Sequence, residues 1–406
     1  MTGPLVVALA LSVAQQPPLD SLVHATLEAH RRPFAVASGG LTGPGGEWLL
    51  ERAGAARFTL IGESHLNAET PAFTTALLRG LRPRGYSAYV TETGPESTRL
   101  FVDALRGGGF DAGEAMMADL PFSIAFFDQR EELRTVVDAL EMGYDIWGVD
   151  QEFIGSPRLL LRRLVAIAPN EGARAVAQTM LDRAMEGFQL FLADGDQSAA
   201  FMVTATGEDL HALASAFAGA GDEADRILAQ LRASHGVYHA YFEGRYYDNN
   251  ATRVDLIRRN LLAHMERAGE SPLSDRRALI KAGSIHAGRG RTPMRVFDIG
   301  ALAAELAFAS GLESFHVNVL TTGSVDAAGA LRSWREQSPE LAPFMDLTPE
   351  TGPVVFDLRP LRALLSDRGG KSEALEELQD IALRFDAMVM YPRFHRADAI
   401  TPMPGG

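Results

Sequence analysis

Short apolar runs alternate with amphipathic stretches along most of the chain, and glycine, proline or charged residues bound each run. Runs of about four to eight apolar or alternating residues are typical of buried strands, whereas i, i+3, i+4 and i+7 spacing is typical of helices. The pattern predicts strands at 58–61, 86–91, 144–149, 277–282, 315–320, 354–356 and 387–390. It predicts helices at 19–30, 70–81, 96–106, 128–142 and 251–266, and a loop over the glycine- and proline-rich 38–46.

Predicted strands and helices alternate up to about residue 150, an order typical of a parallel sheet with right-handed crossover helices. From 156 to 267 the periodicity is helical throughout, so we expect a large helical insertion there. Strand patterns return after the insertion. The sequence therefore predicts one α/β domain over 19–391 with a mostly parallel central sheet, followed by a C-terminal tail over 392–406.

The first residues have the pattern of an export signal. The apolar run 4–14 is too short to cross a bilayer, and Ser12-Val13-Ala14 resembles a small-residue cleavage site. We predict a signal peptide over 1–14 and a periplasmic or secreted protein. The stretch Met1-Thr2-Gly3 lacks the usual Lys or Arg, so a hydrophobic N-terminal helix stays open as the alternative. No later run is long and apolar enough to predict a membrane span.

Composition narrows the class of partner. A hydrophobic content of 46% and a charged content of 22% are those of a globular protein. The net charge of -14 argues against a nucleic acid or an anionic membrane as partner. The absence of cysteine excludes thiolate metal sites and a cysteine nucleophile. Lysine occurs only at Lys281 and Lys371, so almost all positive charge is arginine.

Ionisable residues stand at the ends of four predicted strands. Glu63 and His65 follow the first strand, Glu92 follows the second, Asp150 the third and His286 the fourth. The carboxyl ends of neighbouring parallel strands line one crevice, where ligands bind in open α/β sheets. A single such residue is more often a turn former or a helix cap, but the repetition at successive strand ends predicts one joint site.

Two further stretches are candidates to complete this site. Arg253 and Asn260 share one face of the predicted helix 251–266, and Arg289 follows His286 closely. All three are predicted to bind substrate, with a solvated surface as the alternative. The chain has no G-x-S-x-G, H-E-x-x-H, Walker A or G-x-G-x-x-G pattern. Serines next to both histidines leave a serine nucleophile open.

Four motifs occur in a characteristic order, and they read Leu60-Ile61-Gly62-Glu63-Ser64-His65, Thr91-Glu92-Thr93-Gly94, Gly148-Val149-Asp150 and Ala282-Gly283-Ser284-Ile285-His286. In content and order they resemble the erythromycin esterase, ChaN and Tiki superfamily. Arg253, Ile257 and Asn260 resemble the R-x3-[MI]-x2-N helix of that superfamily, and Phe385-Asp386-Ala387 resembles its last strand. The resemblance extends from about residue 55 to 391.

The resemblance implies a three-layer α/β fold with the site on the crevice side of the sheet. In the esterase branch, the histidine that matches His65 is the base that activates water, supported by the carboxylates that match Glu63 and Glu92. The residues that match His286 and Arg253 steady the oxyanion or the substrate. The function predicted from this branch is an exported hydrolase acting on a small-molecule ester, lactone or amide.

Other branches of the superfamily leave alternatives open. The Tiki branch implies a peptidase whose divalent metal, Mn, Fe or Zn, would be held here by His65, His286, Glu63 and Glu92. The ChaN branch implies a non-catalytic haem or ligand carrier, for which Tyr238 and neighbouring aromatic residues are available. The chain reads Gly62-Glu63-Ser64-His65-Leu66 where esterases carry a longer G-E-x-x-H-G turn, so we do not assign a macrolide substrate.

Overall fold

A mixed sheet of eight strands organises the part of the chain that the structure describes. The computed structural model describes residues 17–37, 39–269, 271–325, 330–368 and 371–401, so the predicted signal peptide 1–14 lies outside the described residues. The sheet strands are β1 (Arg31–Pro33), β4 (Phe58–Glu63), β5 (Tyr86–Thr91), β6 (Asp145–Gly148), β7 (Arg277–Gly283), β8 (Ser314–Thr321), β11 (Val354–Asp357) and β12 (Ala387–Tyr391). Two small hairpins pair β2 (Ala35–Ala37) with β3 (Gly40–Thr42) and β9 (Gly323–Val325) with β10 (Leu331–Ser333).

Helices connect these strands and cover both faces of the sheet. Those before the insertion are α1 (Leu19–His30), α2 (Gly43–Ala55), α3 (Glu69–Leu81), α4 (Pro95–Asp119) and α5 (Arg130–Glu141). Those of the insertion are α6 (Pro157–Ala166), α7 (Glu171–Asp194), α8 (Phe201–Thr204), α9 (Gly207–Ala216), α10 (Asp222–Phe242) and α11 (Tyr246–Arg267). Those after it are α12 (Ser284–Ala287), α13 (Ile299–Ala309), α14 (Ala342–Leu347), α15 (Arg359–Ser366) and α16 (Glu373–Arg384), and short 3-10 turns are η1 (Arg82–Arg84), η2 (Gln197–Ala199) and η3 (Pro339–Leu341).

The strand order brings the ends of β4, β5, β6 and β7 to one edge of the sheet. The order is β1-β11-β12-β8-β4-β7-β5-β6, and all neighbours from β12 to β6 are parallel. Gly62 pairs with Ala282 of β7, and Thr91 of β5 pairs with Lys281. The residues that follow these strands are therefore neighbours in space although far apart in sequence.

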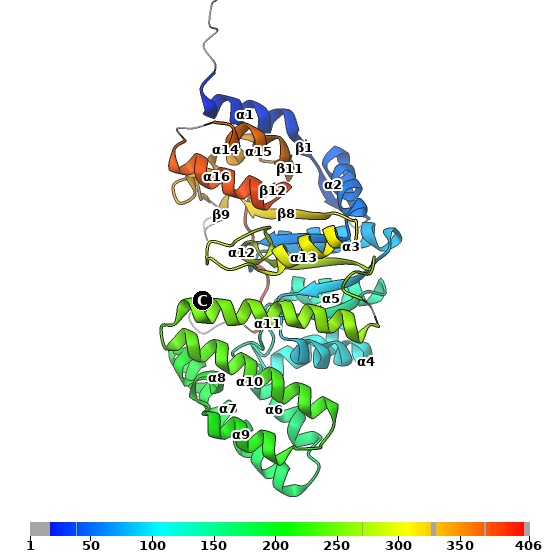
Figure 1. The fold of residues 1–406 in the computed structure, drawn as a ribbon, viewed down its shortest axis with the longest axis vertical. Coiled ribbons are helices and arrows are strands. Elements are labelled where there is room, and N and C mark those ends of the chain that lie inside the picture. The colour runs from blue at the N-terminus through cyan, green and yellow to red at the C-terminus, as the bar shows by residue number, and fades with distance from the viewer. Residues whose placement is uncertain (1–16, 38, 270, 326–329, 369–370, 402–406) are drawn as a thin grey trace, which may run out of the picture.

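Two apolar cores lie on opposite faces of the sheet, which gives three layers (Figure 1). Side chains alternate along a strand, so Ile61 packs with α2, α3 and α5 while Leu60 packs with α1, α11 and α13. The predicted three-layer α/β fold with a mostly parallel sheet is confirmed.

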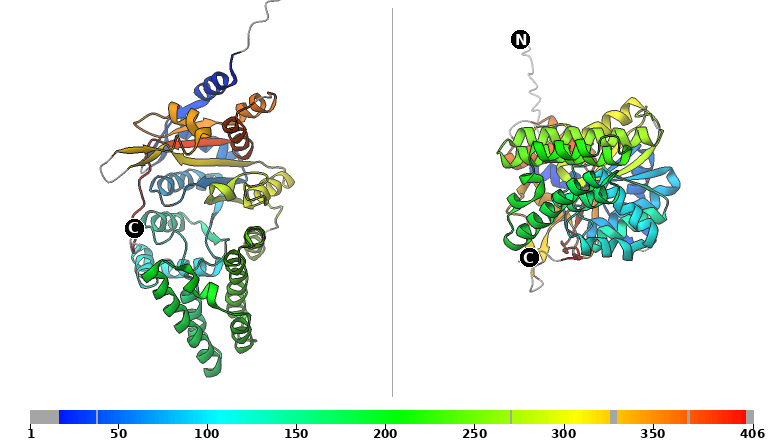
Figure 2. Two further views of the ribbon diagram at one scale, coloured as in Figure 1. Left: turned by 90° about the vertical axis from the view of Figure 1, so that its left-hand side faces the viewer. Right: turned by 90° about the horizontal axis from the view of Figure 1, so that it is seen from below.

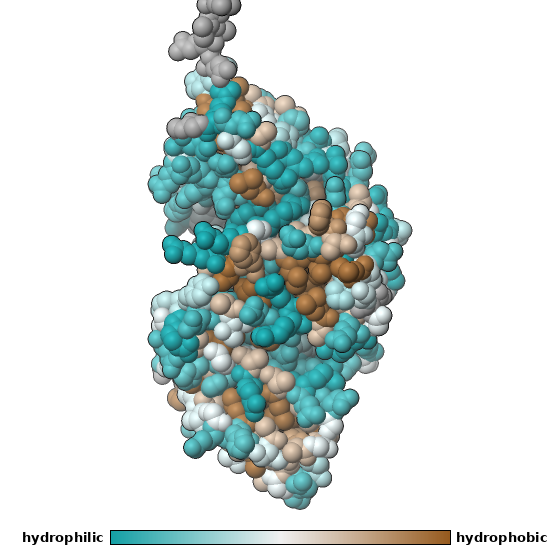
Figure 3. Space-filling view, viewed as in Figure 1, coloured by the Kyte–Doolittle hydropathy of each residue, from teal (hydrophilic) through white to brown (hydrophobic). Residues whose placement is uncertain are grey.

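On the face shown in Figure 3, hydrophobic residues gather around α13, whose Phe308 is exposed.

The insertion forms a helical lobe beyond the β6 edge of the sheet (Figures 1 and 2). Helices α6 to α10 enclose a core of their own, which includes Leu160, Ala177, Leu213 and Ile227. Helix α11 returns from this lobe to the sheet, where Ile257 and Leu261 join the second sheet core. One helix thus belongs to both parts and carries the predicted Arg253 and Asn260.

The loop predicted over 38–46 is wrong, because β3 and the first turn of α2 occupy most of that segment. Its glycines are required by close packing: a Cβ on Gly45 would lie 2.6 Å from the carbonyl oxygen of Arg32. Helix α4 also continues far beyond the predicted 96–106, across a break at Gly109 with φ 63°. Glycine content therefore indicated a loop where tertiary contacts make a helix.

The segment after β12 returns to the carboxyl edge of the sheet. Of the predicted tail 392–406, the structure describes 392–401, and Arg396 and Ala399 form isolated bridges to Asn67 and Gln129. Among the described residues, no helix combines the length and the apolar character that a membrane span needs.

Candidate functional site

A buried ion network lies at the end of β4. The Nζ atom of Lys281, on the neighbouring β7, is 2.6 Å from Oε1 of Glu63 and 2.6 Å from Oε1 of Glu132 on α5. All three side chains are buried. Burial works to raise the pKa of Glu63, but the charge of Lys281 and a hydrogen bond with His65 outweigh it and lower that pKa. Glu63 is therefore an ionised hydrogen-bond acceptor.

His65 lies between two carboxylates and is the accessible member of the cluster. Its Nδ1 is 3.1 Å from Oε1 of Glu63, and its Nε2 is 3.9 Å from Oε2 of Glu92. Its side chain is 35% exposed, against 3% for Glu63. Burial lowers the pKa of His65, but the hydrogen bond with Glu63 and the charges of both carboxylates raise it above 6.5. An ionised Glu63 holds the proton on Nδ1, which leaves Nε2 of the neutral ring as a base.

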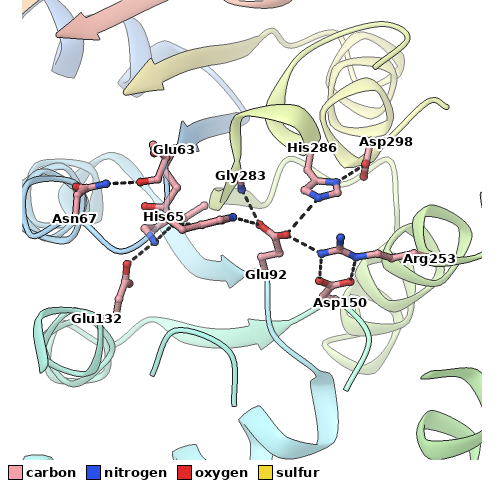
Figure 4. Close-up of polar contacts among 12 residues, drawn as sticks. Glu63, His65, Asn67, Glu92, Glu132, Asp150, Arg253, Gly283, His286 and Asp298 are labelled. Carbon is pink, nitrogen blue, oxygen red and sulfur yellow. Dashed lines mark hydrogen bonds and ion pairs between the residues drawn. The ribbon is translucent and has the colours of Figure 1, made fainter. Parts of the chain in front are cut away.

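Glu92, at the end of β5, is the centre of the cluster (Figure 4). Its Oε2 accepts a 2.6 Å hydrogen bond from the backbone N–H of Gly283. Its Oε1 lies 2.8 Å from the guanidinium of Arg253 and 3.3 Å from Nε2 of His286. Burial works to raise the pKa of Glu92, but the charges of His286, Arg253 and His65 lower it to about 2. The Glu92 carboxylate thus lies between Arg253 and the two histidines, His286 and His65.

His286 is held between two carboxylates. Its Nδ1 is 2.5 Å from Oδ2 of Asp298, which precedes α13 and also accepts from the N–H of Ile299. Burial lowers the pKa of His286, but the charge of Glu92 and the hydrogen bond with Asp298 raise it above 6.5. Since both ring nitrogens face carboxylates, the imidazolium form is favoured.

Position 283 has little room for a side chain, because it lies directly against His65. A Cβ at this position would lie 3.0 Å from Nε2 of His65 and 3.6 Å from Oε2 of Glu92. A side chain here would therefore fill the gap between the imidazole and the carboxylate. The glycine also lets its N–H approach Glu92 closely.

Asp150, which follows β6, is joined to the cluster by Arg253 of α11. Its Nε is 2.9 Å from Oδ1 of Asp150, and its terminal nitrogen lies 2.5 Å from Oδ2 of Asp150 and 2.8 Å from Glu92. Asn260, on the same helix, donates to the carbonyl oxygen of Val149 at 3.0 Å. Its amide also lies 3.4 Å from the carbonyl oxygen of Asp150, so Asn260 positions the backbone that carries this aspartate.

Comparison with solved structures shows what this arrangement is similar to. An erythromycin esterase mutant, EreC, in its open conformation overlaps with 88% of this chain and 95% of its own chain, at a TM-score of 0.56 and 14% identity. The chain has the fold of an erythromycin esterase. A protein from Bacillus cereus overlaps over 94% and 100% of the two chains, at a TM-score of 0.56 and 12% identity.

A third similar structure is a succinoglycan biosynthesis protein, which overlaps over 94% of this chain and 98% of its own at a TM-score of 0.57 and 10% identity. The resemblance inferred from the four motifs is thus confirmed at the level of the fold. No family model matches the chain, and no curated protein matches it.

Six of the predicted site residues come together at the carboxyl edge of the sheet, namely Glu63, His65, Glu92, Asp150, Arg253 and His286. Arg289 does not join them. Arg289 points to the opposite edge of the sheet, where it lies 2.5 Å from Asp386 and 2.6 Å from the carbonyl oxygen of Ser314 at the start of β8. The expectation that Arg289 contributes to the cluster is corrected. A short sequence distance from His286 did not mean the same edge, because the chain after α12 already contacts His316 near the start of β8 through the carbonyl oxygen of Ala287.

Sequence reasoning missed Lys281, Glu132 and Asp298 as members of the site. Lys281 could have been predicted as a site residue, since it is one of two lysines in the chain and lies within an apolar strand. A lysine in a buried strand needs a partner. Asp298 precedes an apolar helix and has the sequence pattern of an N-cap, which concealed its bond to His286.

The donor set does not fit a divalent metal ion. The Oε1 atom of Glu63 bonds to Lys281 and His65, and both oxygens of Glu92 bond to Gly283 and Arg253. In the described ranges of the chain, no group of three or more His, Asp or Glu is arranged to hold a metal. Of the aromatic residues considered for haem, Tyr238 lines a pocket and Tyr241, Tyr246 and Tyr247 are exposed near the α10–α11 turn.

Proposed function

We propose that the chain is a hydrolase that cleaves an ester, lactone or amide bond with water activated by His65. The observation that carries this proposal is the accessible Nε2 of His65, which faces an ionised carboxylate while Nδ1 is anchored to Glu63. A histidine held in one tautomer by a carboxylate is a general base suited to neutral pH. The fold of an esterase agrees with this function but does not establish it.

The gap between His65 and Glu92 suits the attacking water. Nε2 and Oε2 are 3.9 Å apart, too far for a direct hydrogen bond but close enough for both to contact one water. In the proposed step, Nε2 takes a proton from that water as the oxygen attacks the carbonyl carbon. Glu92 accepts the second hydrogen and orients the oxygen. With its pKa at about 2, Glu92 is a poor base and a good anchor.

Collapse of the tetrahedral intermediate breaks the bond to the leaving group. The proton held on Nε2 of His65 then passes to the leaving alkoxide or amine, so the products are an acid and an alcohol or amine, and the imidazole is neutral again. Negative charge on the carbonyl oxygen is stabilised by Arg253 and the His286 imidazolium, both fixed before substrate arrives. Preorganised positive groups of this kind are usually the largest contribution to catalysis.

A panel of p-nitrophenyl esters with acyl chains from acetate to octanoate tests the proposal. We expect the wild type to release p-nitrophenolate, and His65→Ala to lower kcat by about 10²- to 10⁴-fold, since that is the typical contribution of a general base. His286→Ala should lower kcat as well. The circular dichroism spectrum of each variant checks that the loss is not a loss of fold.

A matched control is His235→Ala. His235 lies on α10 in the helical lobe, where its Nε2 is 2.8 Å from the carbonyl oxygen of Ala205. Its removal should leave kcat unchanged. Full activity of both His65→Ala and His286→Ala would contradict the proposed site, and a Soret band in the purified protein without hydrolysis would favour the haem carrier.

A further inference from the structure

An apolar pocket opens directly beside His65. It has a volume of about 400 Å³ and is lined by His65, Leu66, Phe122, Ala125, Phe126, Asp128, Gln129, Phe153, Ile154, Phe191, Gln197, Tyr238, Arg396, Ala399 and Thr401. The loops after β4 and β6, the segment before α5, the helical lobe and the segment after β12 thus all contribute to its wall. The ring of Phe126 stacks on His65 with 4.4 Å between ring centroids. A bound molecule would therefore lie against the base.

Backbone strain is concentrated in this wall. In the described part of the chain, the non-glycine residues with left-handed φ are Leu66 at 67°, Phe122 at 57°, Phe126 at 67° and Arg295 at 65°. The first three line the pocket. Such conformations cost about 1–3 kcal/mol each and are kept where the surroundings impose them.

Close packing holds the segment that carries Phe122 and Phe126. The hydroxyl of Ser156 donates to the carbonyl oxygen of Ser123 at 2.6 Å. A Cβ on Gly155 would lie 2.2 Å from the carbonyl oxygen of Phe122. These contacts fix the backbone at Phe122 and Ser123, and the rings of Phe122 and Phe126 line the pocket.

Charged side chains in this wall include Arg396 and Asp128, and Asp128 has no partner for part of its carboxylate. Asp128 is 4% exposed, and its Oδ2 is buried without a hydrogen bond. Its backbone is fixed on both sides, because its carbonyl oxygen accepts from Ile400 at 2.7 Å and Gln129 bridges to Ala399. Leaving a buried acceptor unpaired costs about 1–3 kcal/mol, so buried polar atoms of this kind call for an explanation.

We propose that the pocket is the specificity site of the hydrolase, and that Asp128 selects substrates whose apolar part carries a hydroxyl or protonated amine. This inference rests on the proposed function, because it places the scissile carbonyl at His65 and the apolar part along Phe122 and Phe126. The N–H or O–H of the substrate would donate to Oδ2 of Asp128. Burial also raises the pKa of Asp128, and hydrogen bonds with Gln129 and with its own backbone offset this only in part.

The chemistry at Asp128 disfavours two other occupants. A carboxylate or phosphate placed against Asp128 would be repelled by its carboxylate, although Arg396 also lines the pocket. A purely apolar chain would fill the aromatic wall but leave Oδ2 of Asp128 unpaired. A site built around a hydrogen-bonding group discriminates strongly against analogues that lack the group, because the unpaired atom stays buried.

Matched ester series test the selection. The substrates are p-nitrophenyl butyrate, hexanoate and octanoate and their ω-hydroxy and ω-amino counterparts, which differ only at the chain end. We expect kcat/KM of the wild type to be about tenfold or more higher for the best hydroxy or amino ester than for the plain ester of equal length. Asp128→Leu should abolish that preference while it leaves the plain esters hydrolysed. Hydroxy and amino arms separate a neutral donor from a cation.

The control is Asp111→Leu, the same change at an exposed position of α4 outside the pocket. It should keep the preference of the wild type. If hydrolysis depends on His65 but Asp128→Leu leaves the preference intact, the inference is overturned and the proposed function stands.

A binding measurement keeps the inference testable if none of the esters is cleaved. Hexanol, hexanediol and aminohexanol are compared by thermal shift and by calorimetric titration. Stronger binding of hexanediol or aminohexanol than of hexanol, lost in Asp128→Leu and kept in Asp111→Leu, would support the pocket even where the hydrolase fails. Equal binding of the three compounds to the wild type, unchanged in Asp128→Leu, would refute it.

Discussion

The two edges of the central sheet contain similar residues with opposite electrostatics. At the carboxyl edge, His286 is buried and its pKa is raised by Glu92 and Asp298. At the opposite edge, His316 is also buried, but burial and the charge of Arg289 lower its pKa to about 3. Its ring bonds to the carbonyl oxygen of Ala287 at 2.7 Å and to the hydroxyl of Ser314 at 2.9 Å.

Burial alone therefore does not decide how a histidine titrates. Each of these histidines loses its hydration, which favours the neutral ring. Two carboxylates reverse this at His286, whereas neutral partners and a nearby arginine reinforce it at His316. The carboxyl edge therefore favours the charged form of its histidines and the opposite edge favours the neutral form of His316, and the carboxyl edge is also the one next to the aromatic pocket.

The two edges should differ most in the stability that is lost when one cation is removed from each. Lys281→Met leaves Glu63 and Glu132 buried without their shared partner, so we expect a loss of about 3–5 kcal/mol in the free energy of unfolding. Arg359→Met removes a cation that pairs with Asp357 at 2.5 Å but is 35% exposed, and it should cost about 1 kcal/mol or less. Urea denaturation followed by circular dichroism measures both, and equal losses would contradict the distinction.

A second test uses two arginines that both pair with an aspartate. Arg253→Gln removes a cation from the proposed oxyanion region, and we expect kcat for a responsive p-nitrophenyl ester to fall by about 10²- to 10³-fold. Arg289→Gln breaks the pair with Asp386 at the other edge and should leave kcat unchanged. Both values are taken per folded molecule, with folded fractions determined from thermal melts. A similar fall in both variants would show that the edges do not differ in function.

A third test, with the smallest expected effect, follows the histidines directly by NMR. His65 and His286 should titrate with midpoints above 6.5, and His316 should stay neutral until the pH approaches about 3. The stability that His65 and His286 contribute is present below pH 6.5 and is lost as the pH rises through their folded pKa values. His316 acts with the opposite sign, because stability is lost as the pH falls from 6.5 toward 3.

The same titration bears on activity. A base must be neutral to accept a proton, so kcat/KM should rise as the pH increases through the raised pKa of His65. The pH profile for one ester, compared with the NMR midpoint of His65, checks this. A profile whose midpoint lies below 6.5 would point to a different base.

The strand ends were predictable because they depend on local patterns. Apolar runs that stop at Glu63, Glu92 and Asp150 specify both strand and polar end, and the alternation of strands and helices specifies the common edge. The helix face and the family resemblance both predicted Arg253 for the site, but neither predicted its pairing with Asp150 and Glu92. The fold class followed from the same order of elements.

The rest depends on contacts between distant segments. The left-handed backbone at Phe122 lies against Gly155, and no local rule predicts such a φ for Phe122 or Phe126. Glycines at the start of α2 indicated a loop, but packing against β1 makes the helix. The pocket could not be predicted from strand ends, since residues of the helical lobe and of the segment after β12 complete it.

The bridges from Arg396 to Asn67 and from Ala399 to Gln129 set an order of events during synthesis. The strands that carry His65 and Glu92 leave the ribosome early, and domains generally fold as units during translation. The wall of the pocket, however, waits for residues 396–401. The base also needs β7, whose Lys281 holds Glu63, but β7 is made before residues 396–401. The base can thus be in place before the enclosure that would choose its substrate, and selectivity would be the last property that a newly made molecule acquires.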